Sequence, residues 1–303
     1  MSNHIREDFS PGYYSGILIF LALILGVNFS LNLENGIIDA YTGRLIRIPM
    51  FFGLYAAVYY VACWLVSRSQ KDWNFWSRKQ FWMYSLFGLG VLSLDRGFPY
   101  LHQVSTWFST DFDLYTWVYK VANHALSFVV VFSPLLLFYY WIDTNRSGFY
   151  GLTKSSNWRP YLILLLLIAP LIGLASLQPG FLSYYPMYKT NAVASLLGWP
   201  DYVPVLIFEF FYGADFINVE LLFRGFFVIG LAQVLGRNAI IPMVTIYCAL
   251  HFGKPLGEAI SSIFGGYLLG IIAYTTRSIW GGILIHVGVA WLMELAAYTV
   301  KHF

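Results

Sequence analysis

The sequence predicts an all-α membrane protein, a polytopic transmembrane bundle of about eight or nine helices. Hydrophobic residues make up 58% of the 303 residues, whereas charged residues make up only 11%. Soluble domains carry about 25% charged residues, so the composition excludes that class. Aromatic residues, which are included in that 58%, make up 20% of the chain, and many Tyr and Trp residues end apolar runs, as they do in the interfacial belts of membrane proteins.

Nine apolar segments account for the expected helices. No small-residue cleavage pattern follows the first of them, so we expect a retained helix and not a signal peptide. The count depends on the third and the seventh segments, which are the shortest. In chain order the segments are Tyr13–Leu33, Pro49–Val66, Phe81–Leu94, Trp117–Ile142, Tyr161–Leu177, Val203–Leu235, Ala239–Leu250, Ala259–Thr275 and Ile279–Val300.

The longest interruption of the apolar pattern is the Pro- and Gly-containing stretch 178–200. It predicts two regions, N-terminal transmembrane helices over 1–200 and a C-terminal core over 201–303 that holds nearly all the polar residues at membrane depth. Basic residues in loops indicate the cytoplasmic side, which predicts a multi-pass protein of the plasma or inner membrane with a cytoplasmic N-terminus. These residues are Arg68, Lys71, Arg78 and Lys79 after the second segment, and Arg146, Lys154 and Arg159 after the fourth.

Charge and cysteine content exclude other classes. The net charge of +3 is small and scattered, so we expect no nucleic-acid partner. Cys63 and Cys248 both lie in apolar segments. They form no CxxC motif and no disulfide framework, and we expect both to be small buried packing residues.

One stretch places opposite charges inside an apolar run. Glu220 and Arg224 lie within residues 216–235, and on a helix a spacing of four puts both side chains on one face. A charge near the bilayer centre costs about 2.5–3.5 kcal/mol on insertion scales, so such residues are usually paired or functional. Two interpretations follow, a buried ion pair that fixes helix packing and a site within the membrane.

Two histidines favour a site. His251 ends the run 247–251, and His286 lies inside the last apolar segment. A lone histidine in a membrane helix is most often a hydrogen-bonding partner between helices. Two of them close to a Glu–Arg helix predict one polar cavity lined by acid, base and cation. The motifs HExxH and GxSxG and the Walker lysine loop are absent, so the common soluble catalytic templates do not apply.

These residues resemble the CPBP family, which comprises CAAX endopeptidases and bacteriocin-processing (Abi) membrane proteins. The matching motifs are ELLFRG at 220–225, YxxxH at 247–251, a glycine-rich step at 264–270 and SIWGGILIH at 278–286. The family pattern is EExxxR, FxxxH and HxxxN on successive helices. The resemblance implies that His251 binds the attacking water, that His286 stabilises the oxyanion, and that Glu220 and Arg224 form a supporting pair.

The match departs from the family at two positions. Val219 replaces the first glutamate, which the resemblance implies to be the general base, and Ala290 replaces the last asparagine. A positioned base contributes about 10²–10⁴-fold and one oxyanion donor about 10²–10³-fold, so losing both without replacement leaves little peptidase. Glu220 and Glu258 are the candidate replacement bases. Glu258 follows a Pro-Gly turn, where a carboxylate also complements a helix N-terminus, so we favour Glu220.

We therefore expect an intramembrane endopeptidase that cleaves a peptide or protein segment presented at the lipid bilayer, with water activated by Glu and His. The resemblance implies no cofactor; the alternative is a metalloprotease with Zn²⁺ held by His251, His286 and a Glu. A catalytically impaired CPBP-like scaffold or binding protein is the rival class. A proton-coupled transporter that uses Glu220 and both histidines is a third, which the lack of an inverted repeat disfavours.

Overall fold

The structure is a computed structural model that describes residues 11–143, 148–152, 158–188 and 192–302, and within these ranges it contains helices and no strand. Each of the nine predicted apolar segments is helical, which confirms the all-α polytopic class. In the described part of the chain, six helical runs are long and apolar enough to cross a membrane, the longest being Tyr202–Ala249 with 48 residues. Arg146, Lys154 and residues 1–10, on which the predicted orientation partly depends, lie outside the described ranges.

The chain divides into two compact units that alternate along the sequence. Unit 1 contains Met1–Gly97 and Phe226–Thr275, and unit 2 contains Phe98–Gly225 and Thr276–Phe303. The division at residue 200 stays a prediction.

Unit 1 is built around α3, whose neighbours are α2, α4 and α14. All ten residues of α14 are buried, which is why this short segment carries no polar face. Phe226 and Phe227, at the start of the second segment of unit 1, pack on Gly88 of α4, where a Cβ would come within 2.8 Å of either ring. The α-helices are α2 (Pro11–Leu31), α3 (Arg47–Gln70), α4 (Lys79–Gly97), α13 (Ala232–Leu235), α14 (Ile240–Ala249) and α15 (Leu256–Thr276).

Short helices connect these elements in unit 1. A π-helix follows α2, and three 3-10 turns lie before α3, before α4 and before α14. They are η1 (Leu33–Ile38), η2 (Asp39–Tyr41), η3 (Asn74–Ser77) and η6 (Gly236–Ala239).

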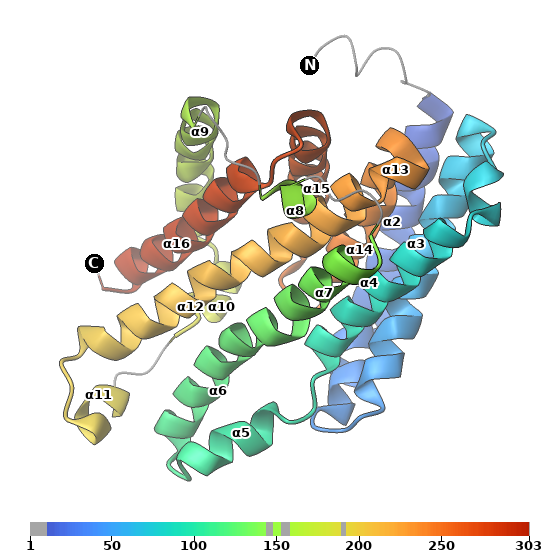
Figure 1. Cartoon of the computed structure of the whole chain (residues 1–303). Coiled ribbons are helices and arrows are strands. Elements are labelled where there is room, and N and C mark those ends of the chain that lie inside the picture. The colour runs from blue at the N-terminus through green and yellow to red at the C-terminus, as the bar shows by residue number, and fades with distance from the viewer. Residues whose placement is uncertain (1–10, 144–147, 153–157, 189–191, 303) are drawn as a thin grey trace. The chain divides into compact units, whose positions relative to one another are not determined.

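In unit 2, α12 lies between α6 and α16, and α16 also packs against α9 (Figure 1). Glycines allow the close approach of α16 to α9, because a Cβ at Gly281 would meet the Tyr161 ring and one at Gly288 would meet Leu165. Asp111 caps α6 by accepting hydrogen bonds from the N–H groups of Asp113 and Leu114. The long helices are α6 (Phe112–Ser127), α7 (Ser133–Trp141), α9 (Arg159–Ala175), α12 (Tyr202–Glu220) and α16 (Trp280–His302).

Shorter elements complete unit 2. The π-helix η4 links α6 to α7, and the predicted loop 178–200 contains two short helices. The elements are η4 (Phe128–Phe132), α5 (Leu101–Phe108), α8 (Gly148–Gly151), α10 (Pro179–Tyr184) and α11 (Ala192–Leu197).

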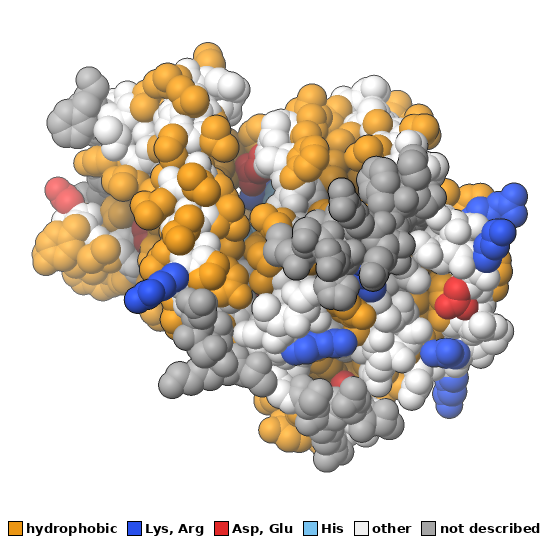
Figure 2. Space-filling view, turned by 90° about the horizontal axis from the view of Figure 1, so that it is seen from above, with side chains coloured by type: hydrophobic (Ala, Val, Ile, Leu, Met, Phe, Trp, Pro, Cys, Tyr) orange, Lys and Arg blue, Asp and Glu red, His pale blue; other side chains and the backbone are white. Residues whose placement is uncertain are grey.

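The surface and the cysteines fit a protein surrounded by lipid. Figure 2 shows hydrophobic side chains over much of the visible surface, and leucines of α9 such as Leu166 and Leu167 are about two-thirds exposed or more. Such large exposed apolar areas are rare on soluble monomers. Cys63 and Cys248 are free thiols with no exposed surface, which confirms their predicted packing role.

Candidate active site

The central acidic residue lies where one helix changes its winding. Glu220 is the last residue of α12, and the chain continues without a break as the π-helix η5 (Leu221–Gly230). The wider winding uses i→i+5 hydrogen bonds, such as the 3.1 Å bond from Leu231 N to Phe226 O. π-Helical turns inside α-helices are frequent at functional sites, because they change the direction in which side chains point.

In unit 2, Glu220, Arg224 and His286 form a buried cluster. Glu220 Oε1 lies 2.9 Å from Arg224 Nη1 and 2.8 Å from His286 Nδ1. Neither Glu220 nor Arg224 has exposed surface. The His286 ring also lies against Phe216, with 4.6 Å between ring centroids. The cluster satisfies the requirement that a charge removed from water be paired, and it brings together three of the five predicted site residues.

The second carboxylate oxygen of Glu220 is in a different environment. Oε2 is buried and has no hydrogen-bond partner among the described residues. It faces Gly282, where a Cβ would come within 2.2 Å of it. A buried carboxylate oxygen without a partner is costly, and the carboxylate fits at this position only because residue 282 lacks a side chain. Oε2 is therefore the oxygen of Glu220 that no described protein group engages in a hydrogen bond.

The contact between His286 and Glu220 assigns the histidine protons. A carboxylate accepts hydrogen bonds, so Nδ1 carries the hydrogen that points to Glu220. In the neutral ring Nε2 is then an acceptor, and it donates only when the ring carries both protons. His286 can thus stabilise an oxyanion only as the imidazolium.

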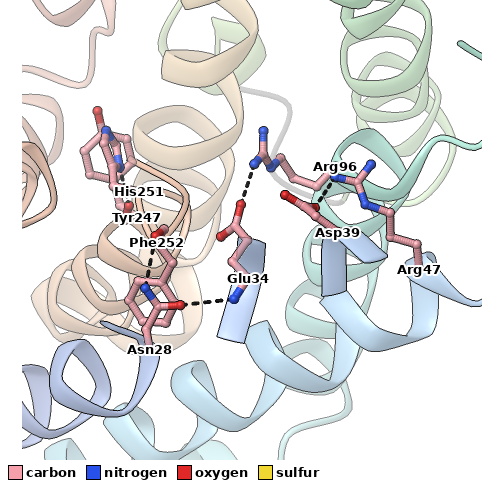
Figure 3. Close-up of polar contacts among 8 residues, drawn as sticks. All are labelled: Asn28, Glu34, Asp39, Arg47, Arg96, Tyr247, His251 and Phe252. Atoms are coloured by element: carbon pink, nitrogen blue, oxygen red, sulfur yellow. Dashed lines mark hydrogen bonds and ion pairs between the residues drawn. The ribbon is translucent and has the colours of Figure 1, made fainter. Parts of the chain in front are cut away.

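The other two predicted residues, His251 and Glu258, belong to unit 1. His251 lies in the turn that follows α14, and its Nδ1 is 2.8 Å from Tyr247 O (Figure 3). Because a carbonyl accepts, Nδ1–H donates and Nε2 presents its lone pair. Glu258, in the first turn of α15, forms an ion pair with Lys254. That pairing, together with its place at the helix start, gives Glu258 a complete structural explanation.

Unit 2 holds polar contacts that sequence reasoning did not include. His124 Nδ1 of α6 lies 2.9 Å from Asp215 Oδ2 of α12, and Asn218 donates to the other Asp215 oxygen at 3.3 Å. Glu294 of α16 accepts the Met187 N–H through both oxygens at 3.0 Å. The sequence did contain a signal for these residues. His124 and Glu294 are polar residues inside apolar runs, as Glu220 is.

The two departures from the CPBP pattern have clear environments. Ala290 is 3% exposed and packs in an apolar cluster with Trp117, Phe208 and Tyr212, so no polar group stands at the expected asparagine position. Val219 is partly buried beside Glu220 on α12. Neither position supplies a polar group of its own.

The proposed zinc alternative does not fit the residues present. Among the described residues, no group of three His, Cys, Asp or Glu side chains is arranged to hold a metal ion. In unit 2 the Nδ1 of His286 is engaged by Glu220 in a hydrogen bond, and a zinc site needs at least three protein ligands. We therefore derive no step through a metal.

Comparison with known proteins finds a similarity in the C-terminal part of the chain. Residues 199–292 match the family model described as "Type II CAAX prenyl endopeptidase Rce1-like". The matched range contains Glu220, Arg224, His251, Glu258 and His286. Neither the search of curated proteins nor the search of solved structures found a match. Residues 199–292 are thus similar to the Rce1-like type II CAAX prenyl endopeptidases, in agreement with the resemblance to the CPBP family, and they lie within an integral membrane protein.

Proposed function

We propose that the protein is an intramembrane endopeptidase in which Glu220 activates water for attack on a peptide bond presented at the membrane. The observation that carries this proposal is that the two carboxylate oxygens of Glu220 have different environments. Oε1 is occupied by Arg224 and His286, whereas Oε2 lies against Gly282 and has no hydrogen-bond partner among the described residues. A base needs an acceptor atom that can take the proton of a bound water, and Oε2 is the Glu220 oxygen that keeps this capacity.

The reaction then follows from the chemistry of these groups. Glu220 Oε2 takes a proton from water while the water oxygen bonds to the scissile carbonyl carbon, which becomes a tetrahedral oxyanion. The carbon–nitrogen bond breaks, and the proton returns from Glu220 to the leaving amine. Arg224 supplies the charge that stabilises the carboxylate in apolar surroundings. His286 as imidazolium donates from Nε2 to the oxyanion, and His251 binds the water, a role taken from the resemblance.

A proteolysis assay in lipid nanodiscs tests the proposal. The substrates are fluorescence-quenched peptides ending in Cys-aliphatic-aliphatic-X, with and without a prenyl group on the cysteine. Glu220→Gln should lower kcat/KM by about 10² to 10⁴, the usual contribution of a general base. His102→Gln is the control, because His102 is exposed and its ring forms a hydrogen bond with the Tyr115 hydroxyl, away from Glu220 in the sequence. Equal cleavage by wild type and Glu220→Gln would refute the proposal.

A non-catalytic membrane scaffold or binding protein is the second candidate. It is favoured by Ala290, because the position expected to hold an oxyanion donor is part of an apolar core. If wild type cleaves no peptide but still binds the prenylated one, this second function replaces the first.

A further inference from the structure

A buried polar network in unit 1 contacts the turn that carries His251, and all its members lie outside the matched range 199–292 (Figure 3). The turn is short. Phe252 N bonds Ala249 O at 3.2 Å and Lys254 N bonds His251 O at 3.1 Å, after which α15 begins at Leu256. These local bonds shape the turn, but they do not by themselves fix its position against the rest of unit 1.

Asn28 of α2 supplies the first link. Its Nδ2 donates to Phe252 O at 3.0 Å, and its Oδ1 accepts the Glu34 N–H at 3.2 Å. Asn28 is 3% exposed, and its side-chain NH₂ donates while its side-chain oxygen accepts, as an amide must. The residue next to His251 is therefore tied directly to the end of α2.

Glu34 and Arg96 supply the second link. Glu34 is 1% exposed, and its Oε1 lies 2.7 Å from Arg96 Nη2. The same oxygen would be 3.0 Å from a Cβ at Gly253, so the glycine lets the turn lie directly against the ion pair. Removing one partner of such a pair leaves an uncompensated charge, which gives the arrangement a single preferred geometry.

We infer that Asn28, Glu34 and Arg96 are positioning residues for His251. The inference rests on the proposed function, in which His251 binds the attacking water. Asn28 and the ion pair hold the backbone at Phe252 and Gly253, and the bond from His251 Nδ1 to Tyr247 O then orients the ring. A displacement of 1 Å at a reacting group can cost about 10²-fold in rate, so the network sets the turnover rate without touching substrate.

The test uses two substitutions that alter the network by small changes. Asn28→Asp keeps the acceptor for Glu34 N–H and loses the donor to Phe252 O. Gly253→Ala places a methyl group against Glu34. Asp39→Asn is the matched control, because it breaks the neighbouring ion pair of Asp39 with Arg47 at 2.6 Å (Figure 3).

We expect both network variants to lower kcat at least about tenfold while KM stays within about twofold, and the control to keep wild-type values. If Asn28→Asp fails to fold, Gly253→Ala still gives the test. Wild-type kcat in a folded network variant, or an equal loss in Asp39→Asn, would overturn the inference.

A second readout does not depend on cleavage. In protein labelled with ¹⁵N-histidine, the His251 signals are assigned by their loss in His251→Gln. Wild type should show the Nδ1–H tautomer alone, and Asn28→Asp should show a mixture of tautomers. An unchanged tautomer in both network variants would overturn the inference. If wild type cleaves nothing, the proposed function fails and this readout alone decides whether the network positions His251.

Discussion

Gly282 of α16 leaves a space that Glu220 of α12 uses, since a Cβ at residue 282 would lie 2.2 Å from Glu220 Oε2. This distance is far inside van der Waals contact, so any side chain there must displace either the carboxylate or the helix. The relationship links a glycine in SIWGGILIH to the chemistry assigned to the first motif.

Gly282→Ala should therefore displace the carboxylate of Glu220. We expect kcat to fall by about 10² or more, because the base leaves the position from which it removes the proton. Peptide cleavage in nanodiscs measures the effect. Gly173→Ala in α9 is the control, since a Cβ there meets nothing within 4 Å. Retained activity in Gly282→Ala would mean that catalysis does not require this position of the Glu220 carboxylate.

Arg224→Ala should unfold the protein at lower temperature. Loss of one partner of a buried pair costs about 3–5 kcal/mol, because Glu220 is left uncompensated. Thermal unfolding in detergent, followed by tryptophan fluorescence, measures this loss. Exposed Arg44 provides the control, because surface substitutions usually change stability by about 0.5 kcal/mol or less. An unchanged midpoint for Arg224→Ala would show that the guanidinium is solvated.

Val219→Glu should test whether the missing glutamate limits activity. The variant restores the family doublet next to Glu220. If wild type cleaves and His251→Ala does not, a replacement base, Glu220 or Glu258, is sufficient. If only Val219→Glu cleaves, the natural protein is an inactive relative. The assay compares all three proteins on the same peptides, and cleavage by His251→Ala at the wild-type rate would contradict the role of His251.

Glu34 should make stability depend on pH. Burial raises the pKa of its carboxyl group above the usual 4.5, and Arg96 opposes the shift. The folded state then binds the proton more tightly than the unfolded state, so protonation of Glu34 stabilises the fold. This contribution to the free energy of unfolding is complete below about pH 4.5 and is lost as pH rises through the folded pKa. Glu34→Gln removes the dependence.

The unfolding midpoint of Glu34→Gln should consequently rise relative to wild type as pH increases above about 4.5. Midpoints measured in detergent from pH 4 to pH 8 provide the comparison, with Asp39→Asn as a second reference. A difference between Glu34→Gln and wild type that is constant over this range would contradict the assigned shift.

The sequence predicted the helical class, and it predicted one cavity lined by Glu220, Arg224, His251 and His286, of which unit 2 brings Glu220, Arg224 and His286 together. Apolar length determines a membrane helix, and a spacing of four brings Glu220 to Arg224. The cost of an unpaired polar group in lipid then requires a partner such as His286. The similarity of residues 199–292 to the Rce1-like endopeptidases was also accessible from the sequence, since each motif is a short local stretch.

Other features depend on distant contacts or on backbone geometry. Asn28 and Phe252 are 224 residues apart, and nothing in either local sequence connects them. The π-helix Leu221–Gly230 has the composition of an ordinary apolar helix, so its wider winding could not be predicted. Only side-chain positions could show that Glu220 Oε2 lies against Gly282 without a hydrogen-bond partner among the described residues.

The spacing of the Glu220 contacts also bears on how the protein enters the bilayer during synthesis. Arg224 emerges from the ribosome four residues after Glu220, whereas His286 is 66 residues later, a delay of about 3 to 13 s at 5–20 residues per second. A carboxylate that waited for His286 would cross the translocon alone. Because its counter-ion is supplied by the same helix, the segment can be inserted as a neutral unit, and the histidine can be added afterwards.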